Sequence, residues 1–249
     1  IRTLEELSSK HGFNLKTIPV DHPGQEQKSQ WLQIRRDRPD YVIMWGWGVM
    51  NQVAIKEAAN IRFPMDKFIG VWWSASEQDV LPAGDGADGY KALTISTVGM
   101  EQPIFADIQK YLVETGKTAG DGNHVGTVLY NRGLFEGFLA AEAIKKAQEI
   151  HGVSKITPAM MRDGMEALEL TADVYNAAGM ENFGPEFKVS CENHAGSGLV
   201  GVSQWDAKNK KWNMIASNIA PDTSIINPLI EQDAMAFAEE SGITPKCLK

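Results

Sequence analysis

The sequence predicts an α/β protein whose first part is a doubly wound, mostly parallel sheet, and two observations predict it. Residues 40–48 and 67–74 are apolar, strand-like runs, and residues 50–62 between them have the apolar spacing of a helix. A strand, a helix and a second strand with short connections place two parallel strands side by side or nearly so. Helices and strands also alternate regularly from residue 4 to residue 97, which is typical of this fold class.

The other elements of this first part follow from local signals. Gly12 is expected to end the first helix in the left-handed conformation, and Pro39 to end the second, because the residue before a proline disfavours helix. Residues 13–20 alternate between apolar and polar side chains, which indicates a strand. Helices are expected at residues 4–11, 26–37 and 77–88, the last with a glycine-rich loop, and a further strand at residues 90–97.

The regular alternation ends after residue 97. Pro158 suits the first turn of a helix, and the polar stretch 206–211 suits the tip of a hairpin. Helices are expected at residues 102–114, 134–151, 157–168 and 226–240, and short strands at residues 187–191 and within 199–216.

Composition and motifs argue against several function classes. The net charge of −8 without a basic cluster argues against nucleic-acid binding, and no apolar run approaches the length of a membrane helix. The five histidines are scattered, and no nucleophile motif or carboxylate pair stands out, so we expect no enzyme, no metal and no cofactor. The glycine pattern of residues 84–89 follows a helix and contains two aspartates, so it indicates a turn and not a dinucleotide site.

Two pairs of tryptophans mark the candidate binding site. Trp45 and Trp47 end the first run, and Trp72 and Trp73 precede Ser74 in the second. Ligands of open α/β sheets bind at the carboxyl edge of the strands, so these residues predict an aromatic wall around a cleft. Alternation would send Trp45 and Trp47 to one face and Trp72 and Trp73 to opposite faces, so at least one of each pair is expected to face the cleft. For any single tryptophan, the alternative is a place in the core.

A second wall of the cleft is expected at the start of the long helix. Tyr130, Asn131 and Arg132 lie there, and an arginine beside a helix N-terminus can hold an anionic group through two hydrogen bonds. A solvent-facing arginine is the alternative.

The cysteines and the start of the chain indicate an exported protein. Cys191 and Cys247 are the only cysteines, and an even pair in a chain with a processed start favours one disulfide in an oxidising compartment over two unconnected thiols. The chain begins at Ile1 inside an amphipathic helix that has no N-cap, so we expect a missing upstream portion.

Several stretches also support a resemblance to a known family by their order and spacing, although none is decisive alone. They are residues 40–48, 67–72, 86–93, 128–134, 142–148, 188–196 and 204–206. Together they resemble type I periplasmic solute-binding proteins, and within these the branched-chain amino acid receptors of ABC transporters. The likeness covers essentially all 249 residues.

The resemblance implies two Rossmann-like lobes with parallel sheets, joined by a multi-strand hinge and closing on a small solute. We expect lobe two at residues 1–97, the returning half of lobe one at residues 98–170, and a segment that crosses between the lobes, with a tail, at residues 171–249. The first part of lobe one is then missing from this chain. The implied protein is a monomeric receptor in the periplasm of a Gram-negative cell, with its signal peptide removed, that delivers its solute to ABC transporter permease subunits.

One departure from the family bears on the ligand. Amino acid receptors of this family place an acidic residue just after the strand that corresponds to residues 68–71, where it meets the ammonium group. This chain has Trp72 and Trp73 there, and its first acid is Glu77. We therefore expect an aromatic or apolar carboxylate, with Arg132 as its partner. The alternatives are a branched-chain amino acid or amide bound by the same fold, or a ligand-sensing regulatory domain.

Overall fold

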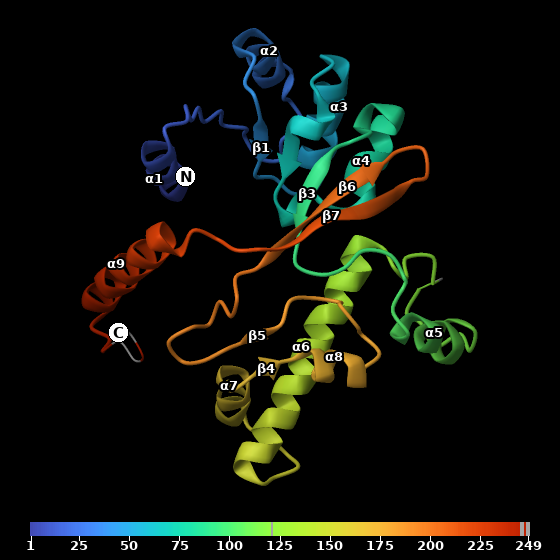
Figure 1. Cartoon of the computed structure of the whole chain (residues 1–249), viewed down its shortest axis with the longest axis vertical. Helices are drawn as coiled ribbons and strands as arrows, with labels where there is room; N and C mark the ends of the chain where they lie inside the picture. Colours follow the sequence, from blue (N-terminus) through green and yellow to red (C-terminus); the bar gives the residue numbers. More distant parts are fainter. Residues whose placement is uncertain (121, 245–246, 248–249) are drawn as a thin grey trace.

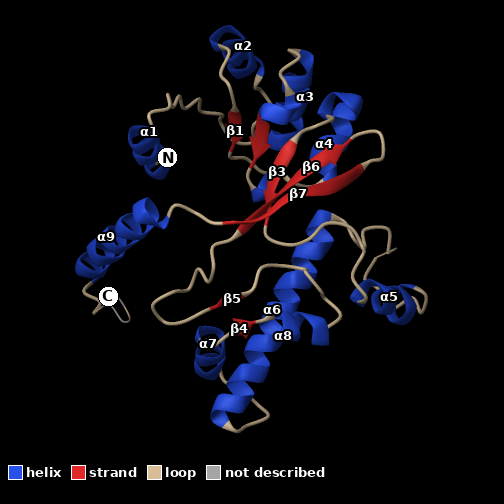
Figure 2. Cartoon of the chain, viewed as in Figure 1, coloured by secondary structure: helices blue, strands red, loops and turns tan. Residues whose placement is uncertain are grey.

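The computed structural model describes residues 1–120, 122–244 and 247 of the chain. Its main sheet has five strands in the order β1-β2-β3-β6-β7 (Figure 2). These strands are β1 Val42–Met44, β2 Phe68–Gly70, β3 Lys91–Thr94, β6 Val200–Asp206 and β7 Lys211–Ile219. The first three strands are parallel to one another, and β6 and β7 run antiparallel to their neighbours. The expected α/β class with a parallel sheet is therefore confirmed.

The helices begin and end at residues that suit those positions. Thr127, Thr157 and Thr171 precede three of the helices, and each side chain accepts a hydrogen bond from a backbone N–H that the first turn leaves free. Gly12 ends the first helix in the left-handed conformation, as the sequence predicts. The α-helices are α1 Arg2–His11, α2 Lys28–Asp37, α3 Val49–Asn60, α4 Glu77–Val80, α5 Ile104–Ile108, α6 Val128–His151, α7 Pro158–Glu166, α8 Ala172–Ala177 and α9 Thr223–Ser241.

Figure 1 shows how these elements are arranged. The main sheet and helices α2 to α4 lie in the upper part of the view, and helices α5 to α8 lie in the lower part. A small antiparallel sheet of β4 (Glu169–Leu170) and β5 (Phe187–Lys188) lies beside α6 and α7. Helices α1 and α9 contact each other at the left of the view.

The first hydrophobic cluster, which we call the sheet core, joins the main sheet to helices α2, α3 and α4. Aromatic rings meet edge to face within it: Trp31 lies 5.1 Å from Phe68, and Phe68 lies 5.0 Å from Tyr90, between ring centroids. Such pairs add about 0.5–1.5 kcal/mol each to the free energy of burial. The fully buried residues include Ile55, Ala58, Phe68, Val80, Ala87, Tyr90 and Ala92. The sheet core thus gives a rigid base to the loops that leave β1 and β2.

The second hydrophobic cluster, which we call the α6 core, packs along the long helix α6. Phe135 stacks on Tyr175 with an interplanar angle of 10°, and Phe138 lies 5.5 Å from the same ring. Burial raises the pKa of Tyr175 well above its usual range. The cluster consists of Phe105, Ile108, Phe135, Phe138, Leu168, Leu170, Tyr175, Met180 and Phe183. The domain boundaries at residues 97 and 170 stay predictions.

One expected strand is wrong. Residues 13–20 form no strand, and Phe13 is 44% exposed. A strand needs a neighbour to satisfy its backbone groups, and no described segment pairs with residues 13–20. Alternating side chains alone therefore do not produce the element.

Other element boundaries also differ from the expectation. Helix α6 begins at Val128, six residues before the expected start at residue 134, because the Thr127 cap sets its first turn. The expected helix at residues 102–114 is α5 followed by a π-helical turn, Gln109–Val113. The short elements β4 and α8 were not expected, since two to six residues carry little periodic signal.

The predicted disulfide is confirmed. Cys191 and Cys247 are bridged, with their Cα atoms 5.5 Å apart. The described residues contain no helix with the length and apolar character that a membrane crossing requires.

Candidate functional site

The carboxyl ends of β1 and β2 lie side by side and lead into the tryptophan residues. Met44 pairs with Gly70, and the Val71 N–H donates to the Met44 carbonyl oxygen at 3.0 Å. Strand β1 ends directly before Trp45, and β2 is followed by a 3₁₀ turn, Trp72–Ser74. Because the two strands are parallel, both loops leave the same edge of the sheet, as the sequence predicts.

The expected alternation of the second tryptophan pair is wrong. Trp72 and Trp73 lie in the 3₁₀ turn, where side chains do not alternate between two faces, and their ring centroids are 5.6 Å apart. Trp47 meets Trp73 edge to face, with centroids 5.8 Å apart and planes at 87°. These three rings form one group, which we call the tryptophan cluster. Trp45 is 66% exposed and forms no ring pair with another described residue.

A shallow hollow of about 310 Å³ lies against Trp47 and Trp73. Trp47 is 52% exposed and Trp73 is 41% exposed, so both indoles leave much apolar surface in water. Covering such surface is favourable by about 25 cal/mol per Å². The two perpendicular rings leave an open angle in which a flat group can stack on one ring and meet the other edge-on. A flat or apolar ligand therefore fits this surface.

A buried polar network holds the two tryptophan loops together. The Asn51 amide donates to the Trp73 carbonyl oxygen at 2.9 Å. The Ser74 hydroxyl lies 2.9 Å from the Gly46 carbonyl oxygen and 3.0 Å from Asn51 Oδ1, both acceptors for its proton. The Tyr90 hydroxyl donates to the Ser74 carbonyl oxygen at 3.0 Å. Gly46 lacks a side chain where a Cβ would lie 2.9 Å from Asn51 Oδ1, so the loop can approach the helix closely.

Arg132 contacts the other side of the tryptophan cluster. Its guanidinium carbon lies 4.7 Å from the centroid of the Trp72 ring, and its Nη2 donates to the Trp72 carbonyl oxygen. Arg132 is half-buried, and burial lowers the pKa of its guanidinium, while the negative charges of Glu136 and Asp79 partly oppose that shift. With the described residues it forms no ion pair. A partly desolvated cation thus lies next to an aromatic surface.

The N-terminus of α6 is occupied by a carboxylate of the chain itself. The Glu77 carboxylate accepts a hydrogen bond from the Val128 N–H, at 3.2 and 3.3 Å to its two oxygens. Burial raises the pKa of Glu77, and it also raises the pKa of Asp79, which accepts from the Ser76 N–H and hydroxyl. The positive end of the helix dipole therefore already has an anionic partner.

The structure brings together only part of the predicted site. Trp47, Trp72, Trp73 and Arg132 lie in contact, as described above. Ser74 and Asn131 are fully buried. The Asn131 amide donates to the carbonyl oxygens of residues 97 and 99, at 3.2 and 2.9 Å. Both side chains therefore form hydrogen bonds with backbone carbonyl groups in this arrangement. Tyr130 packs against the α6 core. Their direct contact with a solute stays a prediction.

Asn51 is the site residue that the sequence reasoning missed. It is fully buried on α3, although the helix was described only by its apolar positions. A polar residue at the start of that helix, three residues after Gly48, was the available signal.

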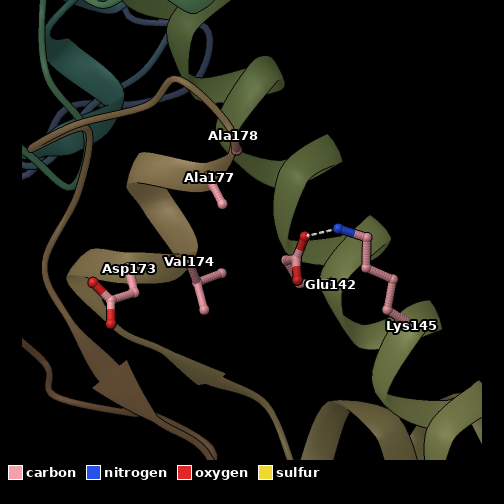
Figure 3. Close-up of a pocket in the computed structure, with 6 residues that line it drawn as sticks. All are labelled: Glu142, Lys145, Asp173, Val174, Ala177 and Ala178. Atoms are coloured by element: carbon pink, nitrogen blue, oxygen red, sulfur yellow. Dashed lines mark hydrogen bonds and ion pairs between the residues drawn. The ribbon is translucent and has the colours of Figure 1, made fainter.

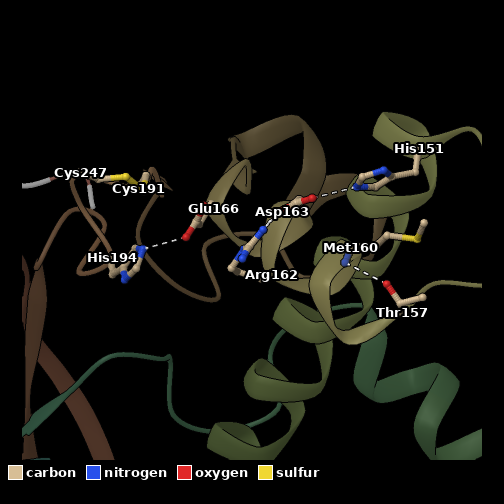
Figure 4. Close-up of polar contacts among 9 residues, drawn as sticks. All are labelled: His151, Thr157, Met160, Arg162, Asp163, Glu166, Cys191, His194 and Cys247. Atoms are coloured by element: carbon tan, nitrogen blue, oxygen red, sulfur yellow. Dashed lines mark hydrogen bonds and ion pairs between the residues drawn. A yellow bond between two sulfur atoms is a disulfide. The ribbon is translucent and has the colours of Figure 1, made fainter. Parts of the chain in front are cut away.

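Two further polar regions lie on the α6 side of the molecule. A hollow between α6 and α8 has the Glu142–Lys145 ion pair on one wall and Asp173 and Val174 on the other (Figure 3). Near the disulfide, His194 lies 3.4 Å from Glu166, and further along α7 Asp163 pairs with His151 and Arg162 (Figure 4). The Lys145 and Arg162 contacts are surface ion pairs, which contribute little free energy each. Among the described residues, no group of histidine, cysteine and acidic side chains is placed to hold a metal ion.

Comparison with known proteins gives a family match over most of the chain. A family model described as periplasmic binding protein matches residues 2–211. No curated protein matches the chain.

Solved structures add more detail. A structure described as an ABC transporter permease from the Pseudomonas fluorescens group is 40% identical, covers 98% of this chain and superposes with a TM-score of 0.91. A branched-chain amino acid ABC transporter protein from Thermus thermophilus with bound valine is 14% identical over 88% of the chain, with a TM-score of 0.66. A solute-binding protein from R. palustris in complex with benzoate is 17% identical over 88%, with a TM-score of 0.59. This chain spans 58%, 56% and 54% of those three chains, respectively.

Proposed function

The chain belongs to the periplasmic binding protein family, and on that premise we propose that it captures a small aromatic or apolar carboxylate for an ABC uptake transporter. The resemblance stated from the sequence is thereby confirmed at the level of the family. The finer parts of the proposal are the solute class, the permease partner and the periplasm of a Gram-negative cell. In this role the chain binds and releases its solute without chemical change, by closure around it.

A single observation carries the solute class: the half-buried cation of Arg132, which has no ion-pair partner among the described residues, lies against Trp72, and the Trp72 ring adjoins the exposed indole of Trp73. Arg132 uses one N–H on the Trp72 carbonyl oxygen, and its remaining donors suit a carboxylate. The hollow beside Trp47 and Trp73 suits the apolar part of the same molecule. An aromatic carboxylate would satisfy the charge and cover the rings together.

The solved relatives are compatible with this class. Two proteins from R. palustris with this fold are complexes with benzoate and with 4-hydroxybenzoate, at 17% and 14% identity. At such identity they support the fold only, and they demonstrate that this fold accommodates aromatic carboxylates.

The second candidate is a branched-chain amino acid. A relative from Thermus thermophilus holds valine, and another from Thermotoga maritima is described as a leucine-binding protein. An amino acid also requires an acidic partner for its ammonium group. The two acids nearest to the second tryptophan pair in the sequence are already engaged, Glu77 with Val128 and Asp79 with Ser76, which favours the first candidate.

Isothermal titration calorimetry on ligand-free protein tests the proposal. Benzoate should bind with a micromolar dissociation constant, and leucine and valine should bind at least about tenfold more weakly, a difference of about 1.4 kcal/mol. Benzamide is the matched control, because it keeps the ring and lacks the charge, and it should also bind more weakly than benzoate. Micromolar binding of leucine or valine, with none of benzoate, would contradict the proposal.

A further inference from the structure

We propose that Asn51 is a positioning residue that sets the relative orientation of Trp47 and Trp73 and thereby makes the site selective for flat rings. The inference rests on the proposed solute site. Asn51 does not touch the hollow: it is fully buried on α3, behind the two loops that form it.

The hydrogen bonds of Asn51 reach both loops. Its Nδ2 donates to the carbonyl oxygen of Trp73, and its Oδ1 faces the Ser74 hydroxyl, which in turn faces the Gly46 carbonyl oxygen beside Trp47. One buried amide therefore connects helix α3 directly to the Trp73 backbone and, through the Ser74 hydroxyl, to the backbone of Gly46, which precedes Trp47.

The orientation of the Asn51 amide is fixed by its partners. If the amide were turned over, Oδ1 would face the Trp73 carbonyl oxygen, and two acceptors would meet in a buried site. Buried polar groups that satisfy one another in this way specify a single local arrangement. Here that arrangement is the edge-to-face pair at 87°, which lets a planar ring stack on one indole while its edge meets the other; a puckered ring has no flat face for either contact.

The test compares two carboxylates that differ only in the ring, benzoate and cyclohexanecarboxylate, and records the near-ultraviolet circular dichroism of the ligand-free protein. Trp73→Phe identifies the band that arises from the coupled indoles. Asn51→Ala should diminish that band and lower the preference for benzoate over cyclohexanecarboxylate by at least about fivefold, as expected when one hydrogen bond that fixes a geometry is lost. Ser74→Ala should act in the same direction.

Ser203→Ala is the matched control. Ser203 is also fully buried, and its hydroxyl also faces a backbone carbonyl oxygen, that of Ala92 at 3.4 Å, within the sheet. This variant should keep both the band and the preference. If Asn51→Ala fails to fold, Ser74→Ala takes its place in the test and is compared with the same control, Ser203→Ala.

The possible results separate the two proposals. An unchanged band and an unchanged preference in Asn51→Ala and Ser74→Ala overturn the positioning role, while benzoate binding by the parent protein still upholds the proposed function. If the parent protein binds neither carboxylate, the proposed function fails and ring selectivity fails with it. In that case, loss of the circular-dichroism band in Asn51→Ala but not in Ser203→Ala would still show that Asn51 sets the relative orientation of the two rings.

Discussion

Arg132 holds Trp72 in two ways: its guanidinium lies 4.7 Å above the indole ring, and one of its N–H groups donates to the carbonyl oxygen of the same residue. A cation over an indole contributes about 0.5–2 kcal/mol, depending on how far the pair is desolvated. The contact connects helix α6 to the loop after β2, and so it joins the two walls that are predicted to belong to different lobes. Arg132 can thus serve both the aromatic surface and an anionic solute.

The first prediction separates these two roles. Arg132→Ala should weaken benzoate binding by about 1.5–3 kcal/mol, the range for a hydrogen bond to a charged group. Benzamide binding should change much less if Arg132 meets the carboxylate directly. An equal loss for benzoate and benzamide would instead assign Arg132 to holding Trp72. Calorimetry with both ligands measures the difference.

Arg162→Ala is the matched control for this variant. Arg162 is an exposed arginine on α7 that pairs with Asp163 at 2.6 Å, away from the tryptophan cluster. Its removal should leave the affinity for benzoate unchanged. If Arg162→Ala weakens benzoate as much as Arg132→Ala does, the effect comes from net charge and the site is misassigned.

The second prediction concerns pH and Glu77. Burial raises the pKa of this carboxyl in the folded protein, so the folded state binds the proton more tightly than the unfolded state does. Its contribution to the free energy of unfolding therefore increases as pH falls through the folded pKa, and it decreases as pH rises. Glu77→Gln removes this term, and its Oε1 can still accept from Val128. The free energy of unfolding of the variant, measured relative to that of the parent protein, should therefore be higher at pH 7 than at pH 4.5.

Urea unfolding at the two pH values measures that difference. Glu149→Gln is a suitable control, because Glu149 lies on the exposed face of α6 and its carboxylate pairs only with Lys146 among the described residues. An equal pH dependence in Glu77→Gln and the parent protein would show that burial does not control this carboxyl.

Much of the fold could be predicted from the sequence, because the signals were local. The run at residues 40–48, the helix after it and the run at residues 67–74 specify a β-α-β unit through apolar spacing alone, and β1 and β2 pair as expected. Residues 13–20 have the spacing of a strand without the neighbour that a strand needs. Pairing is a long-range property, so alternation could not decide it.

The candidate site was predictable only in part. The carboxyl edge of the sheet and the tryptophans follow from topology. The 3₁₀ turn at Trp72 was not visible, since an apolar run continues through the end of β2. Glu77 was noted only as a displaced acid, because its contact with Val128 spans 51 residues of sequence. The role of Asn51 depends on the same kind of distant contact.

The third prediction concerns the disulfide. Cys191 and Cys247 are 56 residues apart, and closing a loop of that length stabilises a protein by about 4 kcal/mol through the entropy of the unfolded chain. The variant with both cysteines changed to serine should lose stability of that order in urea unfolding under oxidising conditions. Under reducing conditions, parent and variant should become nearly equal. Two reactive thiols in the unfolded, unreduced parent protein would contradict the bridge.

The last prediction concerns tryptophan fluorescence on closure. Trp31, Trp205 and Trp212 are buried, so only the exposed indoles can change their contact with water when a solute binds. Benzoate should shift the emission to shorter wavelength and protect part of it from acrylamide, because the solute and the closing walls cover Trp47 and Trp73. Trp31→Phe should keep the full change, since Trp31 lies in the sheet core. Trp47→Phe and Trp73→Phe should each remove part of it. If both of these variants respond as the parent protein does, the solute binds elsewhere and the tryptophan cluster is not its site.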